Sequence, residues 1–299
     1  MTKKGWILFA AMAFFWGIPY LLIRIAVRDL APGLLVFGRT APAALLLLPL
    51  VIARKQFGAI VRHAGWILVF GVVEFGVPWF FMGTAERHIT SSLTSLIICG
   101  VPLLSLIAAR FTSAHEAITS KRLLGLALGG SGVAVLVGLD LGHGSAKWIG
   151  LMVLVCVGYA VGPLVLATKL ADVPGPAVVC GATGMVALGW LPYALTHLPH
   201  HLAAETWWSM ATLSVVCTAA AFLTFFALIQ EAGSGRSLVV VYSNTAIAVL
   251  LGVIFLHEPL TVGMAIGFPL IVAGSYLGTS ASKSGPAITG TDPYIAINE

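Results

Sequence analysis

Long apolar runs follow one another along almost the whole chain, separated by short stretches that hold charge, proline and glycine. Each run approaches the length of about 20 residues that a helix needs to cross a hydrocarbon core of roughly 30 Å. The alternating pattern of barrel strands is absent, and lipid-exposed backbone must form its own hydrogen bonds, so we expect helices. The predicted spans are residues 6 to 27, 33 to 53, 65 to 85, 91 to 110, 122 to 139, 148 to 169, 175 to 196, 207 to 230, 237 to 256 and 261 to 279.

The composition excludes a water-soluble fold. Hydrophobic residues make up 59% of the 299 residues and charged residues only 9%, whereas ordinary soluble domains carry roughly a quarter charged residues. The first run follows Lys3 and Lys4 but is too long for a secretory signal and has no small-residue cleavage site, so we interpret it as the first span. We therefore predict an all-α integral membrane protein with ten transmembrane helices.

The basic residues predict an orientation. The net charge is +5, but Lys and Arg lie between apolar runs, as positive-inside bias requires, and indicate no nucleic-acid partner. With the N-terminus inside, eleven of the 16 basic residues fall on that side, four on the other, and Arg39 lies within a span. We expect both termini in the cytoplasm, a location in the inner (cytoplasmic) membrane, and a flexible cytoplasmic tail at 280–299. The eleven are Lys3, Lys4, Arg54, Lys55, Arg62, Arg110, Lys121, Arg122, Lys169, Arg236 and Lys283.

An internal repeat divides the chain. A displacement of 142 residues carries His115-Glu116 onto His257-Glu258, Gly125 onto Gly267, and Gly132 onto Gly274. Residues 1–139 and 140–279 then form two repeats of five helices, and the odd number inverts the second relative to the first. Inverted repeats are typical of secondary transporters, whose substrate site lies near the midplane between the halves.

These motifs resemble a known family. Trp16-Gly17, Phe37-Gly38-Arg39 and the Glu-Gly-Gly pattern ending both halves are similar to the drug/metabolite transporter superfamily, EamA type, over roughly residues 6 to 279. The resemblance implies a basket-shaped fold of two inverted five-helix repeats. The aromatic first and third spans are most similar to YddG-type exporters of aromatic amino acids, which implies outward transport of neutral, preferably aromatic or hydrophobic, amino acids by alternating access. The second half departs from the pattern, because Tyr159-Ala160 replaces the Trp-Gly pair and Asn244 replaces the proline found at Pro102.

Two ionisable residues lie deep within predicted spans. Glu74 lies about ten residues into the third span, near the bilayer centre, and Arg39 differs from it in height by about 7 Å from the helix rise. Because such charges cost about 2.5 to 3.5 kcal/mol in the membrane, each should face a cavity or a partner. The two side chains could form an ion pair; alternatively, Arg39 holds a substrate carboxylate, or Glu74 couples helices or senses protons.

Aromatic and polar side chains complete the candidate substrate site. Trp16 and Tyr20 share a helix face, and Phe81 shares a face with Glu74, next to Trp79. Such faces suit a ring-bearing amphipathic ligand, although each aromatic residue could also simply pack. The predicted substrate-binding residues are Trp16, Tyr20, Arg39, Glu74, Trp79, Phe81, Tyr242 and Asn244.

We interpret the spaced glycine pairs and the cysteines as residues that pack between helices. Gly125 and Gly129, like Gly263 and Gly267, have the spacing of close helix contacts. The four cysteines lie inside apolar runs without CxxC spacing and predict neither a metal site nor a redox pair.

Other functions remain as alternatives. A broad exporter of cationic or amphipathic drugs would use Glu74 as the cation's partner. An intramembrane enzyme would use Ser131 of Gly129-Gly130-Ser131-Gly132, but the histidines lie in loops or at span ends, so Ser131 has no obvious base. His197, His200 and His201 could bind metal but are more typical of an interfacial loop. We predict no catalytic residues, no metal and no cofactor, with small molecules and lipid as partners; the oligomeric state is open, and a monomer is compatible with the sequence.

Overall fold

The computed structural model describes residues 2–108, 120–140, 146–199, 201–232 and 240–280. Every regular element in these ranges is a helix, and two of them, η1 and η3, are π-helical. The elements are α1 (Lys3–Gly17), α2 (Pro19–Ala26), α3 (Pro32–Ala53), α4 (Phe57–Arg62), α5 (Ala64–Gly71), η1 (Val72–Gly76), α6 (Val77–Ala85), α7 (Ser91–Ile98), α8 (Val101–Ala108), α9 (Ser120–Asp140), α10 (Ala146–Lys169), α11 (Gly175–Thr196), α12 (Ala204–Ser214), η3 (Val215–Ala220), α13 (Ala221–Ala232), α15 (Val240–Leu256) and α16 (Val262–Ser280).

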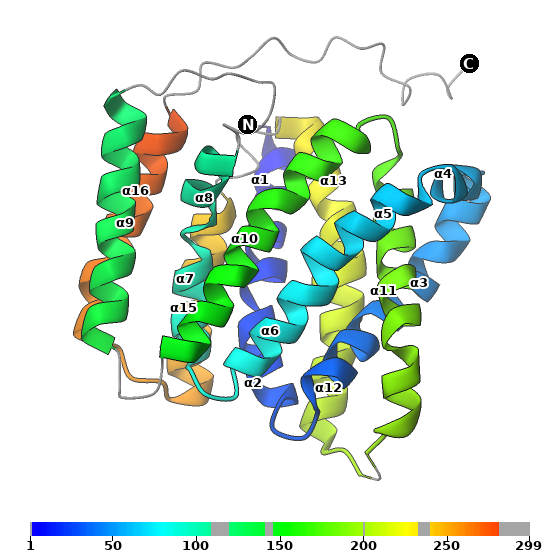
Figure 1. The fold of residues 1–299 in the computed structure, drawn as a ribbon, viewed down its shortest axis with the longest axis horizontal. Helices are drawn as coiled ribbons and strands as arrows, with labels where there is room; N and C mark the ends of the chain where they lie inside the picture. The colour runs from blue at the N-terminus through cyan, green and yellow to red at the C-terminus, as the bar shows by residue number, and fades with distance from the viewer. Residues whose placement is uncertain (1, 109–119, 141–145, 200, 233–239, 281–299) are drawn as a thin grey trace.

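Apolar helices stand side by side in one bundle (Figure 1). Within the described residues, six helical stretches are long and apolar enough to cross a membrane, and four shorter apolar helices accompany them. The long stretches are Lys3–Ala26, Pro32–Ala53, Ala64–Ala85, Ala146–Lys169, Gly175–Thr196 and Ala204–Ala232, and the shorter ones are Ser91–Ser105, Leu123–Val135, Val240–Leu256 and Val262–Gly274.

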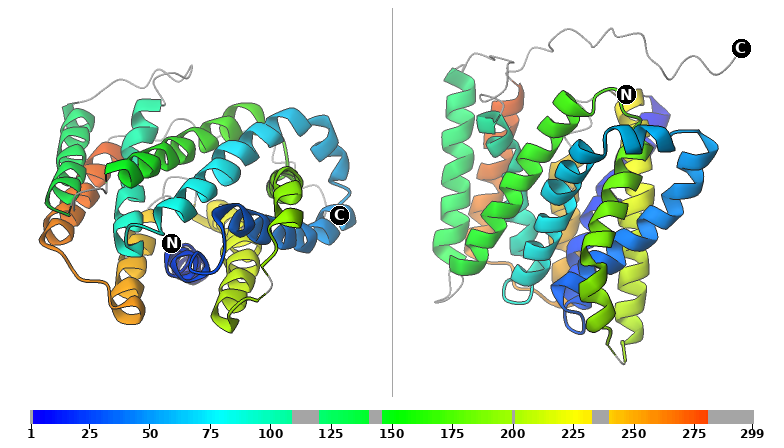
Figure 2. Two further views of the ribbon diagram at one scale, coloured as in Figure 1. Left: turned by 60° about the horizontal axis from the view of Figure 1, so that its bottom comes forward. Right: turned by 45° about the vertical axis from the view of Figure 1, so that its right-hand side comes forward.

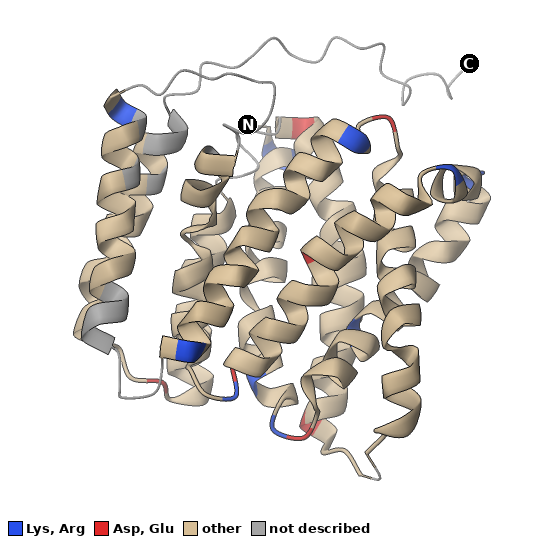
Figure 3. Ribbon diagram, in the orientation of Figure 1, with Lys and Arg blue, Asp and Glu red and all other residues tan. Residues whose placement is uncertain are grey.

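The outer surface of the bundle is apolar between its two ends. Leu45 is 67% exposed, Leu188 68% and Ile254 60%, all within helices. Lys, Arg, Asp and Glu gather at the two ends and are nearly absent from the middle (Figure 3). A surface of this kind is costly in water and suits lipid, so the chain is a multi-pass membrane protein.

Proline and glycine interrupt two of the predicted spans. Pro19 is the first residue of α2, where its missing N–H costs nothing, and it divides the first span into α1 and α2. The fourth span is divided at Cys99 and Gly100 into α7 and α8, with Pro102 near the start of α8. In the predicted ninth span, Asn244 follows Pro102 by 142 residues, the displacement of the expected repeat, and α15 continues through it.

Close helix contacts through glycine define one edge of the bundle. Helices α9 and α16 lie along each other at this edge, and α3 packs against α11 nearer the other (Figures 1 and 2). A Cβ atom added to Gly132 would lie 2.8 Å from the carbonyl oxygen of Gly267, and one added to Gly274 would collide with the backbone of Gly129. The expected packing role is therefore confirmed for Gly129 and Gly267, and that of Gly263 stays a prediction.

Several predicted features lie outside the described residues. They are Arg110, His115, Glu116, His200, Arg236 and the tail beyond residue 280.

Candidate functional site

Arg39 lies on α3 in the interior of the bundle and is only 4% exposed. Its Nε donates to Thr218 Oγ1 at 3.0 Å, and its Nη2 donates to the Cys217 carbonyl oxygen at 3.4 Å. Its Nη1 has no hydrogen-bond partner among the described residues. A buried guanidinium with an unused N–H donor is costly unless an acceptor bonds to that donor, and a carboxylate is an acceptor of this kind.

The widened turn of η3 supplies the acceptors for Arg39. Thr218 Oγ1 donates to the Leu213 carbonyl oxygen, five residues earlier, at 2.8 Å. Single π-helical turns inside α-helices change the direction of side chains and carbonyl groups, and they are frequent at functional sites. The η3 turn therefore presents both a hydroxyl and a carbonyl oxygen to α3.

Trp79 forms the aromatic side of this centre. The guanidinium carbon of Arg39 lies 3.6 Å from the centroid of the Trp79 ring, and the Trp79 indole Nε1 donates to the Tyr159 hydroxyl at 3.1 Å. Phe75 of η1 contacts Trp79 with ring centroids 4.9 Å apart, and Phe222 of α13 contacts Phe75 at 5.4 Å. The cation–π contact stabilises the charge of Arg39 and orients the ring beside it.

Glu74 does not pair with Arg39, contrary to one of the sequence-based alternatives. Within the described part of the chain, the one ion pair joins Lys4 to Glu231. Glu74 lies on η1, and its Oε2 is buried without a hydrogen-bond partner among the described residues. A Cβ atom added to Gly162 of α10 would collide with this oxygen. Thus Glu74 packs toward α10, whereas Arg39 faces η3 and Trp79.

Three further aromatic candidates have their own neighbours. Trp16 packs on Phe222 and Phe225, with ring centroids 6.0 and 4.8 Å away. Tyr20 is 6% exposed in the core. Phe81 is half-buried beside Phe80, at a centroid distance of 5.9 Å. Trp16 thus joins the aromatic group around Phe222, and the binding roles of all three side chains stay predictions.

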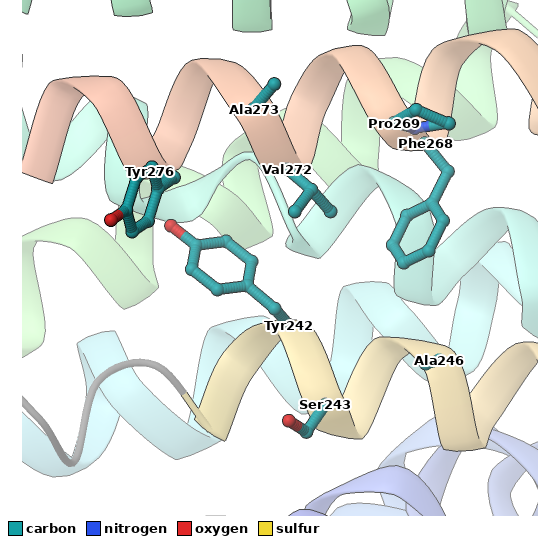
Figure 4. A pocket seen from close by; sticks show the side chains of 8 residues that line it. All are labelled: Tyr242, Ser243, Ala246, Phe268, Pro269, Val272, Ala273 and Tyr276. Atoms are coloured by element: carbon teal, nitrogen blue, oxygen red, sulfur yellow. The ribbon is translucent and has the colours of Figure 1, made fainter.

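The two candidates on α15 are separated. Asn244 is buried, its backbone oxygen lies close to Gly17 of α1, and its side-chain oxygen accepts from Thr245 at 3.3 Å. Tyr242 instead lines a cavity of about 600 Å³ between α15 and α16 (Figure 4). The cavity is lined by Tyr242, Ser243, Ala246, Phe268, Pro269, Val272, Ala273 and Tyr276.

This cavity is not the polar centre. Of the predicted site residues only Tyr242 lines it, and most of its lining is apolar. We take Arg39 and Trp79 as the candidate site, because a buried guanidinium with an unused donor beside an aromatic ring can hold an anionic group.

Sequence reasoning missed two residues of this centre as binding candidates. Tyr159 accepts from Trp79, and Thr218 accepts from Arg39. Tyr159 carried a signal, because it replaces the tryptophan of the Trp-Gly motif in the second half. Thr218 carried none, since a threonine in an apolar run usually bonds its own helix.

Ser131 and His197, which belong to the enzyme and metal alternatives, make ordinary packing and hydrogen-bond contacts among the described residues. Ser131 on α9 is exposed, and its hydroxyl donates to the Leu128 carbonyl oxygen at 2.8 Å. His197 stacks on Tyr193 at a centroid distance of 4.0 Å. Among the described residues, no three His, Cys, Asp or Glu side chains are grouped to hold a metal ion.

The fold and the site together define a multi-pass helical membrane protein with a buried centre of one guanidinium and several aromatic rings. The chain belongs to the EamA-like transporter family of the drug/metabolite transporter superfamily, because the family model matches residues 3–138 and again residues 146–279. It is 25% identical over 288 residues to an uncharacterized transporter of Archaeoglobus fulgidus, covering 92% of this chain and 98% of the relative. It is 24% identical over 302 residues to the uncharacterized transporter YvbV of Bacillus subtilis, covering 98% and 95%.

A solved crystal structure has a similar fold. Its TM-score is 0.68 at 19% sequence identity, and the match covers 95% of this chain and 99% of the other. At this identity, the likeness concerns the fold alone.

Proposed function

We propose that the chain is a secondary transporter that exports neutral, preferably aromatic or hydrophobic, amino acids across the cytoplasmic membrane. The observation that carries this proposal is the free Nη1 of Arg39 beside the face of Trp79. The guanidinium suits the substrate carboxylate, and the rings of Trp79, Phe75 and Phe222 suit an apolar or aromatic side chain. Tyr159, which accepts a hydrogen bond from Trp79, is a candidate for additional polar recognition, and the binding role of Asn244 stays a prediction from the sequence.

The transport mechanism proposed is alternating access between two inverted five-helix repeats, residues 1–139 and 140–279. Two matches to one family model support this division. The π-helical turns η1 and η3 support it as well, because they begin 143 residues apart, at Val72 and Val215, and so occupy equivalent positions in the two halves. Both turns lie beside the centre, as expected for a site between repeats.

The helix pairs also fit an inverted repeat. If the two halves are exchanged, α1 takes the place of α10, α13 that of α6 and α15 that of α7. The contact of α10 with α6 then corresponds to that of α1 with α13, and the contact of α10 with α7 corresponds to that of α1 with α15. In the pairs α9 with α16 and α3 with α11, each helix contacts its own equivalent in the other half. A twofold relation between the halves predicts these correspondences.

The test is uptake of radiolabelled amino acids into proteoliposomes that hold the purified protein. We expect saturable uptake of phenylalanine that unlabelled neutral amino acids compete away. Absence of uptake or exchange for every amino acid in a broad panel would refute the substrate class.

A second candidate, export of cationic or amphipathic drugs, is favoured by the buried and unpartnered Oε2 of Glu74. In that case E74Q abolishes transport of cations and spares zwitterions. Equal transport of cationic drugs by E74Q and the wild type would remove this candidate.

A further inference from the structure

Glu86 is a fully buried carboxylate that the proposed substrate site does not use. It follows the last residue of the Ala64–Ala85 span and is 0% exposed. Neither carboxylate oxygen has a hydrogen-bond partner among the described residues. Arg24 of α2 lies against it, but its guanidinium donates to the backbone carbonyl of Glu86 and not to the carboxylate.

A second glutamate, Glu258, accepts hydrogen bonds from the N-terminus of α7. Glu258 Oε1 accepts from Ser91 N at 2.7 Å and from Ser91 Oγ at 2.9 Å, and its Oε2 accepts from Ser92 N at 2.9 Å and Ser92 Oγ at 2.6 Å. These four bonds, here called the Glu258 clamp, satisfy free N–H groups at the start of α7, where a negative charge is favourable. The clamp joins the start of α7, five residues after Glu86, to the segment that follows α15.

Other charged groups around Glu86 are engaged elsewhere. Arg87 on its own turn donates to the Leu30 carbonyl oxygen at 2.8 Å. His88 stacks on Trp148 of α10 with centroids 3.7 Å apart, and Lys147 lies 4.8 Å from the centroid of the same ring.

The charges that act on Glu86 are Arg24 from α2, Arg39 from α3 and Glu258. Tyr20 of α2 also lies within electrostatic range. Burial raises the pKa of the Glu86 carboxyl well above its ordinary range; Arg24 opposes the shift, and Glu258 adds to it. A carboxylate without donors is costly to keep charged in such surroundings, so the protonated form is favoured while this end of the bundle is closed.

We propose that Glu86 is the residue that binds and releases a proton during transport, and that opening of the Glu258 clamp is the step that exposes it to water. This inference rests on the proposed function. When Glu258 leaves Ser91 and Ser92, water reaches Glu86, the carboxyl loses its proton to that water, and the ionised side chain is hydrated. Reclosing requires a proton to be taken up again from the same side.

The sign of the pH dependence follows from linkage. A carboxyl with a higher pKa in the closed than in the open arrangement binds a proton on closing. Low pH on that side therefore favours the closed arrangement, and rising pH favours the open one.

The test compares E86Q with E205Q in proteoliposomes. Glu205 is an exposed carboxylate at the start of α12 and serves as the matched control. We first measure exchange of labelled internal against unlabelled external phenylalanine without a pH difference, and then net flux with an imposed pH difference. Glutamine imitates the protonated carboxyl, so E86Q should keep exchange and lose the acceleration by the pH difference, whereas E205Q should keep both.

The outcomes separate the two proposals. Exchange by the wild type together with an undiminished response of E86Q to the pH difference overturns the role of Glu86 and leaves the proposed function standing. Absence of exchange by the wild type, across the amino-acid panel, refutes the proposed function and this inference with it.

A measurement on the wild type covers the case in which E86Q does not fold. Exchange of phenylalanine by the wild type is measured while the pH of one side of the membrane is changed and the pH of the other is held constant, and then with the two sides reversed. Dependence of the exchange rate on the pH of one side supports the proposal, and an exchange rate that depends on the pH of neither side overturns it.

Discussion

Arg39 combines burial, charge and an unused donor in one side chain. The Thr218 hydroxyl and the Cys217 carbonyl satisfy part of the guanidinium, and Trp79 covers its face. A charged hydrogen bond of this kind contributes about 1.5–3 kcal/mol, so the position of the guanidinium depends on Thr218, whereas Nη1 has no partner among the described residues.

Substitution T218V tests this dependence. Valine keeps the shape but removes the acceptor of Arg39 Nε, so we expect a loss of about 1–3 kcal/mol in stability. Thermal unfolding in detergent measures the effect. The control T168V removes an exposed hydroxyl that bonds only its own helix, at Leu164, and should change stability by less than about 0.5 kcal/mol. Equal effects of the two variants would contradict the role of Thr218.

The depth of Arg39 and Glu74 was readable from the sequence, but their partners were not. Residue counting along an apolar run predicts height, because the helix rise is constant. It does not predict which neighbour faces a side chain, and the acceptor of Arg39 lies 179 residues away on a π-helical turn.

At the scale of elements, departures from regular helix position the functional groups. The turns η1 and η3 carry Glu74 and Thr218, and they lie inside apolar runs whose composition does not distinguish α from π geometry. The existence of these spans was predictable from hydrophobicity, whereas the widened turns depend on packing between helices.

The segment after α15 is a second such departure. His257 has a φ of 54°, the left-handed conformation common where a helix ends, and it directs the chain so that Glu258 reaches α7. The Glu258 N–H donates to the Gly252 carbonyl oxygen at 3.1 Å.

Substitution G252A tests how tightly this segment is packed. The new Cβ would lie 2.5 Å from Ser92 Oγ and 2.6 Å from Glu258 Oε2. We expect the Glu258 clamp to separate, with a loss of about 1–3 kcal/mol in stability in detergent. The control G150A places its Cβ in open space on α10 and should be neutral or stabilising by up to about 1 kcal/mol. A neutral G252A would show that the clamp is not closely packed.

At the scale of the molecule, the charged ends and the apolar middle follow from the composition, and the helical bundle follows from the run lengths. The glycine spacing predicted close packing of the spans that form α9 and α16, because only small residues let two helix backbones come this close together. The position of the central site was not predictable to the same degree, since it requires α3, α6, α10 and η3 to meet.

The proposed orientation, with both termini in the cytoplasm, is tested by labelling new cysteines. The four native cysteines are buried, so background labelling should be low. Asp172 follows α10, and Glu205 lies in the first turn of α12, at the other end of the intervening helix α11. We expect E205C to react with an impermeant thiol reagent in intact cells and D172C to react only after permeabilisation. The reverse pattern would overturn the orientation.

The most direct test of the central claim is phenylalanine exchange by R39Q, compared with the wild type and R62Q. Arg62 is an exposed basic residue on α4, so its substitution controls for the lost charge. If Arg39 holds the substrate carboxylate, R39Q raises the half-saturating concentration of phenylalanine at least about tenfold, the equivalent of about 1.4 kcal/mol, while R62Q does not. Inhibition by phenethylamine, which lacks the carboxylate, should be the same in all three proteins. Unchanged half-saturation by phenylalanine in a folded R39Q would contradict the account.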